Sequence, residues 1–232
     1  MKKILFLFLL AVCSMSLSAQ APSKKCPVCG LSIPKCQYKG KHPDPKQQNK
    51  PIPVSKPTGY INNHGYVDLG LSVKWATCNI GASSPSEYGD VFAWGETSTK
   101  SEYLESNCST YKDMGDISGN PQYDAACAIW GSTWRMPTKA EWKELVDMCS
   151  WKWTLKGAHY GCVFTSKKNG SSIFLPVKSR KDGDSYWSST PHKDSSGGRD
   201  YFSYYFYVGP SDPFIPGGLA RFYGSPIRPV TF

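Results

Sequence analysis

The stretch "WRMPTKAEWKELVDMC", residues 134–149, gives the clearest helix signal in this chain of 232 residues. Thr138 and Glu141 are three positions apart, which is the spacing of a capping box at the start of a helix. Apolar residues then recur at helical spacing, at Trp142, Leu145, Val146 and Cys149. The stretch therefore predicts one amphipathic helix with a buried apolar face.

The flanking sequence predicts one more helix and then a sheet. Upstream, "YDAACAIWG" (123–131) favours a shorter helix. Downstream, "CVFTSKKNGSSIFLPV" (162–177) holds an Asn-Gly pair between two alternating apolar segments, which is typical of a β-hairpin. The aromatic run "YFSYYFYV" (201–208) predicts a further strand.

Before the helices, "YVDLGLSVKWATCNIG" (66–81) and "YGDVFAWGE" (88–96) are predicted as strands bounded by Gly and Ser clusters. The fold class we expect is α+β, with two early helices and a late antiparallel sheet. Five tryptophans in these blocks are expected in the core: Trp75, Trp94, Trp130, Trp134 and Trp142.

The first 58 residues differ from the rest in composition. Residues 1–19 have two lysines, an apolar run and small residues, which is the layout of a signal peptide, so we expect the chain to be exported to the periplasm, the cell surface or the medium. Residues 20–42 form a small Cys-rich segment, and residues 43–58, with five prolines, are predicted as a linker. The remaining residues, 59–232, are long enough for one domain.

The net charge of +9 is concentrated before this domain, because residues 59–232 hold 17 basic and 17 acidic groups. A nucleic-acid-binding domain carries its basic patch on the folded part, so we expect no nucleic-acid partner. Contact with a membrane is expected only peripherally, through the lysine-rich residues 20–58.

The Cys-rich segment has the spacing of a zinc knuckle. Cys26, Cys29, Cys36 and His42 could complete a tetrahedral site for one structural zinc ion. An exported chain also favours disulfides, so a disulfide or a redox dithiol among these cysteines remains open.

Within the domain, Cys78 and Cys149 are the pair we expect to form a disulfide, with burial as free thiols as the alternative. The histidines of the domain have no partner at a catalytic spacing, and we expect no catalytic residue.

The end of the chain uses a restricted set of amino acids. Residues 1–193 carry 46 Lys, Glu, Gln, Met and Trp residues, and the last 39 residues carry none. A tail of strands and turns favours Tyr, Phe, Gly, Pro and Ser, so a purely structural origin of this composition stays open.

Several ordered blocks, from "GYVDLGLSVKWATCNIGA" through "WRMPTKAEWKELVDMC" and "YWSST" to the closing "RFYGSPIRPV", resemble the Fibrobacter succinogenes major paralogous domain family. The resemblance covers nearly all of residues 60–232 and implies a C-type-lectin-like fold, related to that of the formylglycine-generating enzymes. The calcium-binding triplets of sugar-binding C-type lectins are not present, so no calcium site is recognised. The late cysteines of the formylglycine-generating enzymes are also missing, because Cys162 is the last one.

Proteins of this fold include the variable proteins of diversity-generating retroelements. There, randomised adenines rewrite Asn codons near the C-terminus, and such codons cannot reach Lys, Glu, Gln, Met or Trp. The resemblance therefore implies that the tail is a diversified binding surface, and the ending from Gly224 to Val230 resembles the segment that closes such regions.

The sequence thus favours a ligand-binding or adhesin-like module for a protein or glycan on another cell, a phage or a host surface. An enzyme of the formylglycine-generating or hydrolytic type, or a structural component of a surface assembly, remains the alternative. The expected ligand-binding residues are Tyr201, Ser203, Tyr205, Tyr207, Asp212, Phe214, Ile215, Leu219, Arg221, Phe222 and Tyr223.

Overall fold

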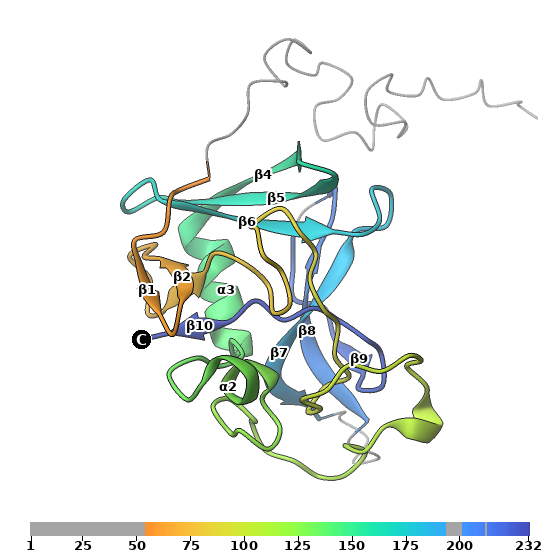
Figure 1. Ribbon diagram of the computed structural model, residues 1–232. Coiled ribbons are helices and arrows are strands. Elements are labelled where there is room, and N and C mark those ends of the chain that lie inside the picture. The colour runs from red at the N-terminus through yellow and green to blue at the C-terminus, as the bar shows by residue number, and fades with distance from the viewer. Residues whose placement is uncertain (1–53, 194–200, 212) are drawn as a thin grey trace, which may run out of the picture. The chain divides into compact units, whose positions relative to one another are not determined.

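The computed structural model describes residues 54–193, 201–211 and 213–232. These residues form a mixed domain that is mostly antiparallel sheet, with few helices (Figure 1). The coarse fold class expected from the sequence is therefore confirmed. In the part of the chain that is described, no helix is long and apolar enough to cross a membrane.

The first sheet joins the two ends of the domain. Its strands lie in the order β1–β2–β3–β10, with β10 pairing antiparallel to β3. Their bounds are Gly59–Ile61 (β1), His64–Val67 (β2), Lys74–Ala76 (β3) and Val230–Thr231 (β10). The β1–β2 turn uses Asn62 and Asn63 with φ of 48° and 64°, a conformation that asparagine tolerates better than most residues. Strand β10, at the end of the domain, therefore completes a sheet that begins with the first strands of the domain.

Two helices follow, as the sequence predicts. Helix α2 spans Ala125–Trp130, and helix α3 spans Lys139–Met148. The capping box of α3 is confirmed: the Thr138 hydroxyl accepts from the Glu141 amide, and the Glu141 carboxylate accepts from the Thr138 amide at 2.8 Å. Helix α3 lies among the sheets, below β4–β6 and beside β7 and β8 in Figure 1.

The other two sheets are built from consecutive strands. The second has the order β4–β5–β6, and its β5–β6 hairpin turns at Asn169 and Gly170 as predicted. The third has the order β7–β8–β9. The bounds are Cys149–Lys156 (β4), His159–Ser166 (β5), Ser172–Val177 (β6), Asp184–His192 (β7), Phe202–Val208 (β8) and Gly218–Ala220 (β9).

Two of the predicted strands need correction. Residues 66–81 do not form one strand, because β2 and β3 are separated by a turn at residues 68–73. Residues 88–96 form almost no ladder: Phe92 makes one isolated bridge, to Ser225, although Phe92 and Trp94 are fully buried. Phe92, Ala93 and Trp94 are buried one after another, so the apolar character of this stretch reflects burial without a neighbouring strand.

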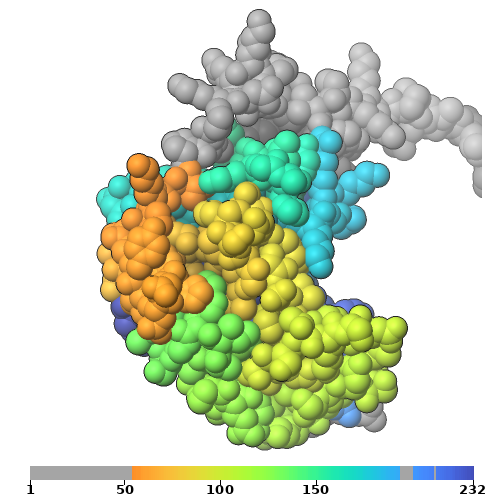
Figure 2. Space-filling model, in the orientation of Figure 1, coloured from red at the N-terminus to blue at the C-terminus, as the bar shows by residue number. Residues whose placement is uncertain are grey.

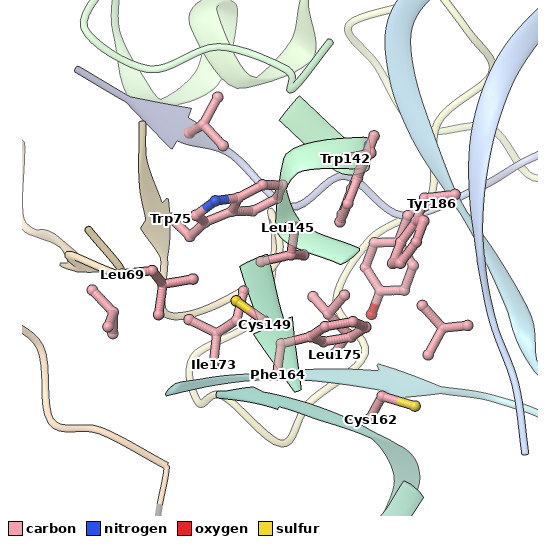
Figure 3. Close-up of a cluster of buried hydrophobic side chains, with 14 of the residues drawn as sticks. Leu69, Trp75, Trp142, Leu145, Cys149, Cys162, Phe164, Ile173, Leu175 and Tyr186 are labelled. Carbon is pink, nitrogen blue, oxygen red and sulfur yellow. The ribbon is translucent and has the colours of Figure 1, made fainter. Parts of the chain in front are cut away.

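The interior has two hydrophobic clusters. The first, here called the sheet core, surrounds α3, and Figure 3 shows Trp75 and Trp142 lying close together above Phe164 and Leu175. The second, the loop core, lies under the long connection between β3 and α2. It includes Ile80, Phe92, Trp94, Trp130, Trp134, Trp187 and Ile227. All five tryptophans expected in the core are buried.

The last residues of the chain run through the middle of the domain. Ser225 bonds to Phe92, Ile227 accepts from the Ile80 amide, and Val230 pairs with Trp75. Arg228 is fully buried and donates to the Asn79 side chain and to the carbonyls of Ala76, Thr77 and Phe174. Residues 225–231, here called the closing segment, thus hold separate parts of the fold together.

Candidate binding surface

Strand β8 carries the first group of predicted site residues, and its two faces are covered by different cores. Phe206 stacks on Trp142 in the sheet core, with ring centroids 4.5 Å apart. On the opposite face, Tyr205 packs against the loop core and Ser203 is fully buried. The sequence predicts that Ser203 faces outward, so its assignment to a binding surface is corrected. Phe202, which the sequence does not assign to the binding surface, is exposed.

Arg221 is the clearest correction among the predicted site residues. Its side chain is fully buried, and its guanidinium lies 4.2 Å from the ring centre of Trp94. It donates to the Ser203 hydroxyl at 3.1 Å and to the carbonyls of Thr110 and Lys112, both at 2.8 Å. A desolvated guanidinium with these partners holds the loop at residues 110–112 from the interior of the domain. Because Arg221 is buried, it cannot contact a ligand directly.

An aromatic cluster covers the solvent side of this loop. Tyr111 stacks on Tyr201 with centroids 4.4 Å apart and meets the edge of Phe222 at 6.4 Å. Phe222 in turn lies 4.3 Å from Tyr223, whose side chain is 49% exposed. We call these four residues the aromatic surface. Burial, aided by the nearby Cys108 and Glu105 side chains, raises the pKa of Tyr111 to about 12, so this ring is uncharged at neutral pH.

The remaining predicted residues lie elsewhere. Tyr207 and the exposed Phe214 pair at the far end of β8, and the Tyr207 hydroxyl donates to the Asp182 carbonyl. Residues 201 and 207 are six positions apart on an extended strand, about 20 Å. Ile215 packs against the sheet core and Leu219 against the loop core, whereas Asp212 lies outside the described residues. The predicted ligand-binding residues therefore do not form one site. One group lies at the aromatic surface, a second at the Tyr207–Phe214 pair, and the others pack against the two cores or lie outside the described residues.

Tyr111 is the residue of the aromatic surface that the sequence does not indicate. It lies in "CSTYKDMG", residues 108–115, which has neither helical nor strand periodicity. Its partner Tyr201 is 90 positions away, so no local pattern brings them together. A large aromatic residue in an irregular segment is the only signal that the sequence offers.

The cysteines of the domain do not form the expected pair. Cys78 and Cys149 are both free thiols, and Cys149 lies inside the sheet core beside Leu145 and Ile173 (Figure 3). Burial raises the pKa of the Cys149 thiol to about 11, which keeps it protonated and unreactive at neutral pH. The alternative that the sequence leaves open, burial as a free thiol, describes Cys149.

The expected zinc ligands Cys26, Cys29, Cys36 and His42 lie outside the described residues. Within the described ranges, no group of three or more His, Cys, Asp or Glu side chains could hold a metal ion. The predicted linker, residues 43–58, overlaps the described part only at its end, where Ser55 and Thr58 already donate backbone hydrogen bonds to Ser172 and Tyr66.

Comparisons of the chain with protein-family models, with curated proteins and with solved structures found no match.

Proposed function

We propose that this chain is an exported, adhesin-like binding module that contacts its ligand through the aromatic surface of Tyr111, Tyr201, Phe222 and Tyr223. The single observation that carries the proposal is a set of partly exposed rings, with Tyr223 the most exposed, over a buried support. Arg221 is buried and anchors the loop that carries Tyr111. Tyr223, two positions after Arg221, is half exposed. Rings held in place lose little entropy on binding, which makes them efficient contact residues.

The restricted composition of the tail supports the same proposal when it is divided by exposure. The closing segment and Arg221 are buried and bond to distant parts of the fold. Phe202, Phe214 and Tyr223 are exposed large hydrophobic residues in the same tail. A tail with a fixed buried framework and exposed aromatic positions suits the variable region of a C-type-lectin-like member of the Fibrobacter succinogenes major paralogous domain family. A reverse-transcriptase gene beside this one, with a near-copy of its 3′ end differing at adenines, would support this origin.

The proposal is tested with a double variant, Phe222→Ser with Tyr223→Ser. Labelled full-length protein is applied to a printed glycan array and to whole bacterial and epithelial cells. We expect the unaltered protein to bind at least one of these targets and the double variant to lose binding by about tenfold or more, because both ring contacts are removed. The melting temperature should fall by only a few degrees, since both rings are at the surface.

Phe214→Ser is the matched control, because Phe214 is exposed to 47% but lies at the other end of β8. It should bind like the unaltered protein. Equal binding by the double variant, or loss of binding in the control alone, contradicts the assignment of the ligand to the aromatic surface.

A further inference from the structure

A second surface feature, separate from the aromatic surface, lies on the connection between β3 and α2. It is an open groove of about 480 Å³, and its lining contains no aliphatic side chain among the described residues. The walls come from three stretches: residues 95–100, residues 107–112, and the turn before α2. In Figure 2 this connection forms the yellow and yellow-green surface in the centre and lower part of the molecule.

The floor of the groove is rigid and its polar groups are satisfied. The Glu96 carboxylate accepts from the amide and the hydroxyl of Ser109 at 2.8 and 3.0 Å, and it is paired with Lys100. Lys100 also donates to the Asn107 carbonyl, and the Asn107 amide group donates to the Glu102 carbonyl. The carboxylate that lines the groove is therefore neutralised by its own neighbours.

The rim, in contrast, presents polar side chains without partners. Thr97, Ser98 and Gln122 make no side-chain hydrogen bond to any other described residue. Lys112 forms no ion pair with a described carboxylate; its ammonium group donates only to the Tyr123 hydroxyl, at 3.2 Å, and lies over the Tyr123 ring. The rim therefore offers two hydroxyls, an amide and an uncompensated positive charge.

The backbone that carries Lys112 and the Tyr123 ring is held by buried anchors. Arg221 fixes the Lys112 carbonyl, and the Thr110 hydroxyl donates to the Trp94 carbonyl at 2.6 Å. Tyr123 packs against the loop core, and its backbone amide donates to the Asn120 carbonyl. A site whose backbone is held in place before the ligand arrives loses less entropy on binding.

We propose that this groove binds an acidic saccharide. Hydroxyl and amide groups can both donate to and accept from sugar hydroxyls, and the Tyr123 ring supplies the apolar wall. The unpaired Lys112 ammonium selects a carboxylate-bearing sugar unit through a charge-assisted hydrogen bond. A peptide ligand is disfavoured because the groove has no apolar pocket for an anchor side chain. This inference does not depend on the proposed role of the aromatic surface.

The test is titration calorimetry of the full-length protein with tetragalacturonate and with its carboxyl-reduced counterpart. We expect the acidic tetrasaccharide to bind, and the reduced one to bind roughly tenfold or more weakly, because the charge-assisted bond to Lys112 is lost. Sodium acetate and sodium sulfate serve as simple anions, and neither should compete at equal concentration.

Lys112→Gln removes the charge and should reduce binding of tetragalacturonate by roughly tenfold, while leaving the backbone bond from Arg221 in place. Lys152→Gln is the matched control, since Lys152 is an exposed lysine on β4, away from the groove. Phe222→Ser with Tyr223→Ser should bind tetragalacturonate normally, which separates this site from the aromatic surface.

The inference is overturned by no binding of tetragalacturonate, by equal binding of the two tetrasaccharides, or by full competition from a simple anion. It is also overturned if Lys112→Gln binds like the unaltered protein, or if Lys152→Gln weakens binding as much as Lys112→Gln does.

Discussion

At the scale of single residues, the sequence predicts burial well for tryptophan and poorly for arginine. The five expected core tryptophans are buried, because leaving a large apolar side chain in water is unfavourable. Arg221 is expected at the surface as one of the ligand-binding residues of the tail. Its buried role depends on carbonyls at positions 110 and 112, more than 100 residues earlier, and no local pattern could connect them.

The buried position of Arg221 predicts a large loss of stability on truncation. Arg221→Ala should lower the free energy of unfolding by about 3 kcal/mol or more, because two carbonyls and the Ser203 hydroxyl lose their charged donor in a buried site. Urea denaturation followed by tryptophan fluorescence measures this change. Tyr223→Ala, two positions away and half exposed, should stay within about 1 kcal/mol of the unaltered protein. If Arg221→Ala were as stable as the unaltered protein but had lost ligand binding, Arg221 would be a ligand-contacting residue and its buried structural role would be wrong.

At the scale of elements, the segments predicted best are those whose ends are marked by a local sequence signal. Helix α3 has its capping box, and the β5–β6 hairpin has its Asn-Gly turn. Residues 88–96 are predicted as a strand but form no ladder, because their backbone amides donate to scattered partners at Ile80, Ser225 and Arg221. An apolar composition indicates that a stretch is buried, and the pairing partner decides whether it forms a strand.

The hairpin turn gives a prediction with a matched control in the same chain. Gly170 has φ of +74°, and a methyl group added at its Cα would meet open space, so Gly170→Ala introduces backbone strain without a clash. We expect a loss of about 1 kcal/mol in the free energy of unfolding. Gly115 also has open space but no positive φ, so Gly115→Ala should cost nothing measurable. Equal effects of the two substitutions in urea denaturation would show that the turn is not constrained as described.

At the scale of the whole molecule, the class is predictable and the topology is not. Antiparallel strands after two helices follow from the order of the patterns. The division into three sheets depends on contacts such as Val230 with Trp75, more than 150 residues apart. The aromatic surface has the same origin, because Tyr111 and Tyr201 meet only after the chain has folded.

The domain as a whole should lose stability in alkali. Burial raises the pKa of Cys149 from 9.0 to about 11, and burial also raises the pKa of Tyr186 and Cys162. The unfolded chain therefore ionises at lower pH than the folded one, so this contribution to stability is complete below about pH 9 and declines as the pH rises towards 11. Urea midpoints at about pH 7, 9 and 10.5 measure the decline. Cys149→Ala should flatten its first part, and a constant midpoint up to about pH 11 would contradict the burial of these groups.

The closing segment limits how early during synthesis the domain can finish folding. Its residues are synthesised long after Phe92, Ile80 and Trp75, and they supply the backbone partners of these three residues. At ~5–20 residues per second, the first strands of a nascent chain wait on the order of ten seconds for these partners. The domain therefore cannot be completed until residues 225–231 have left the ribosome. Under the export that we propose, the same delay would leave the chain incompletely folded, and so able to pass through a translocation channel, for as long as residues 225–231 are not available.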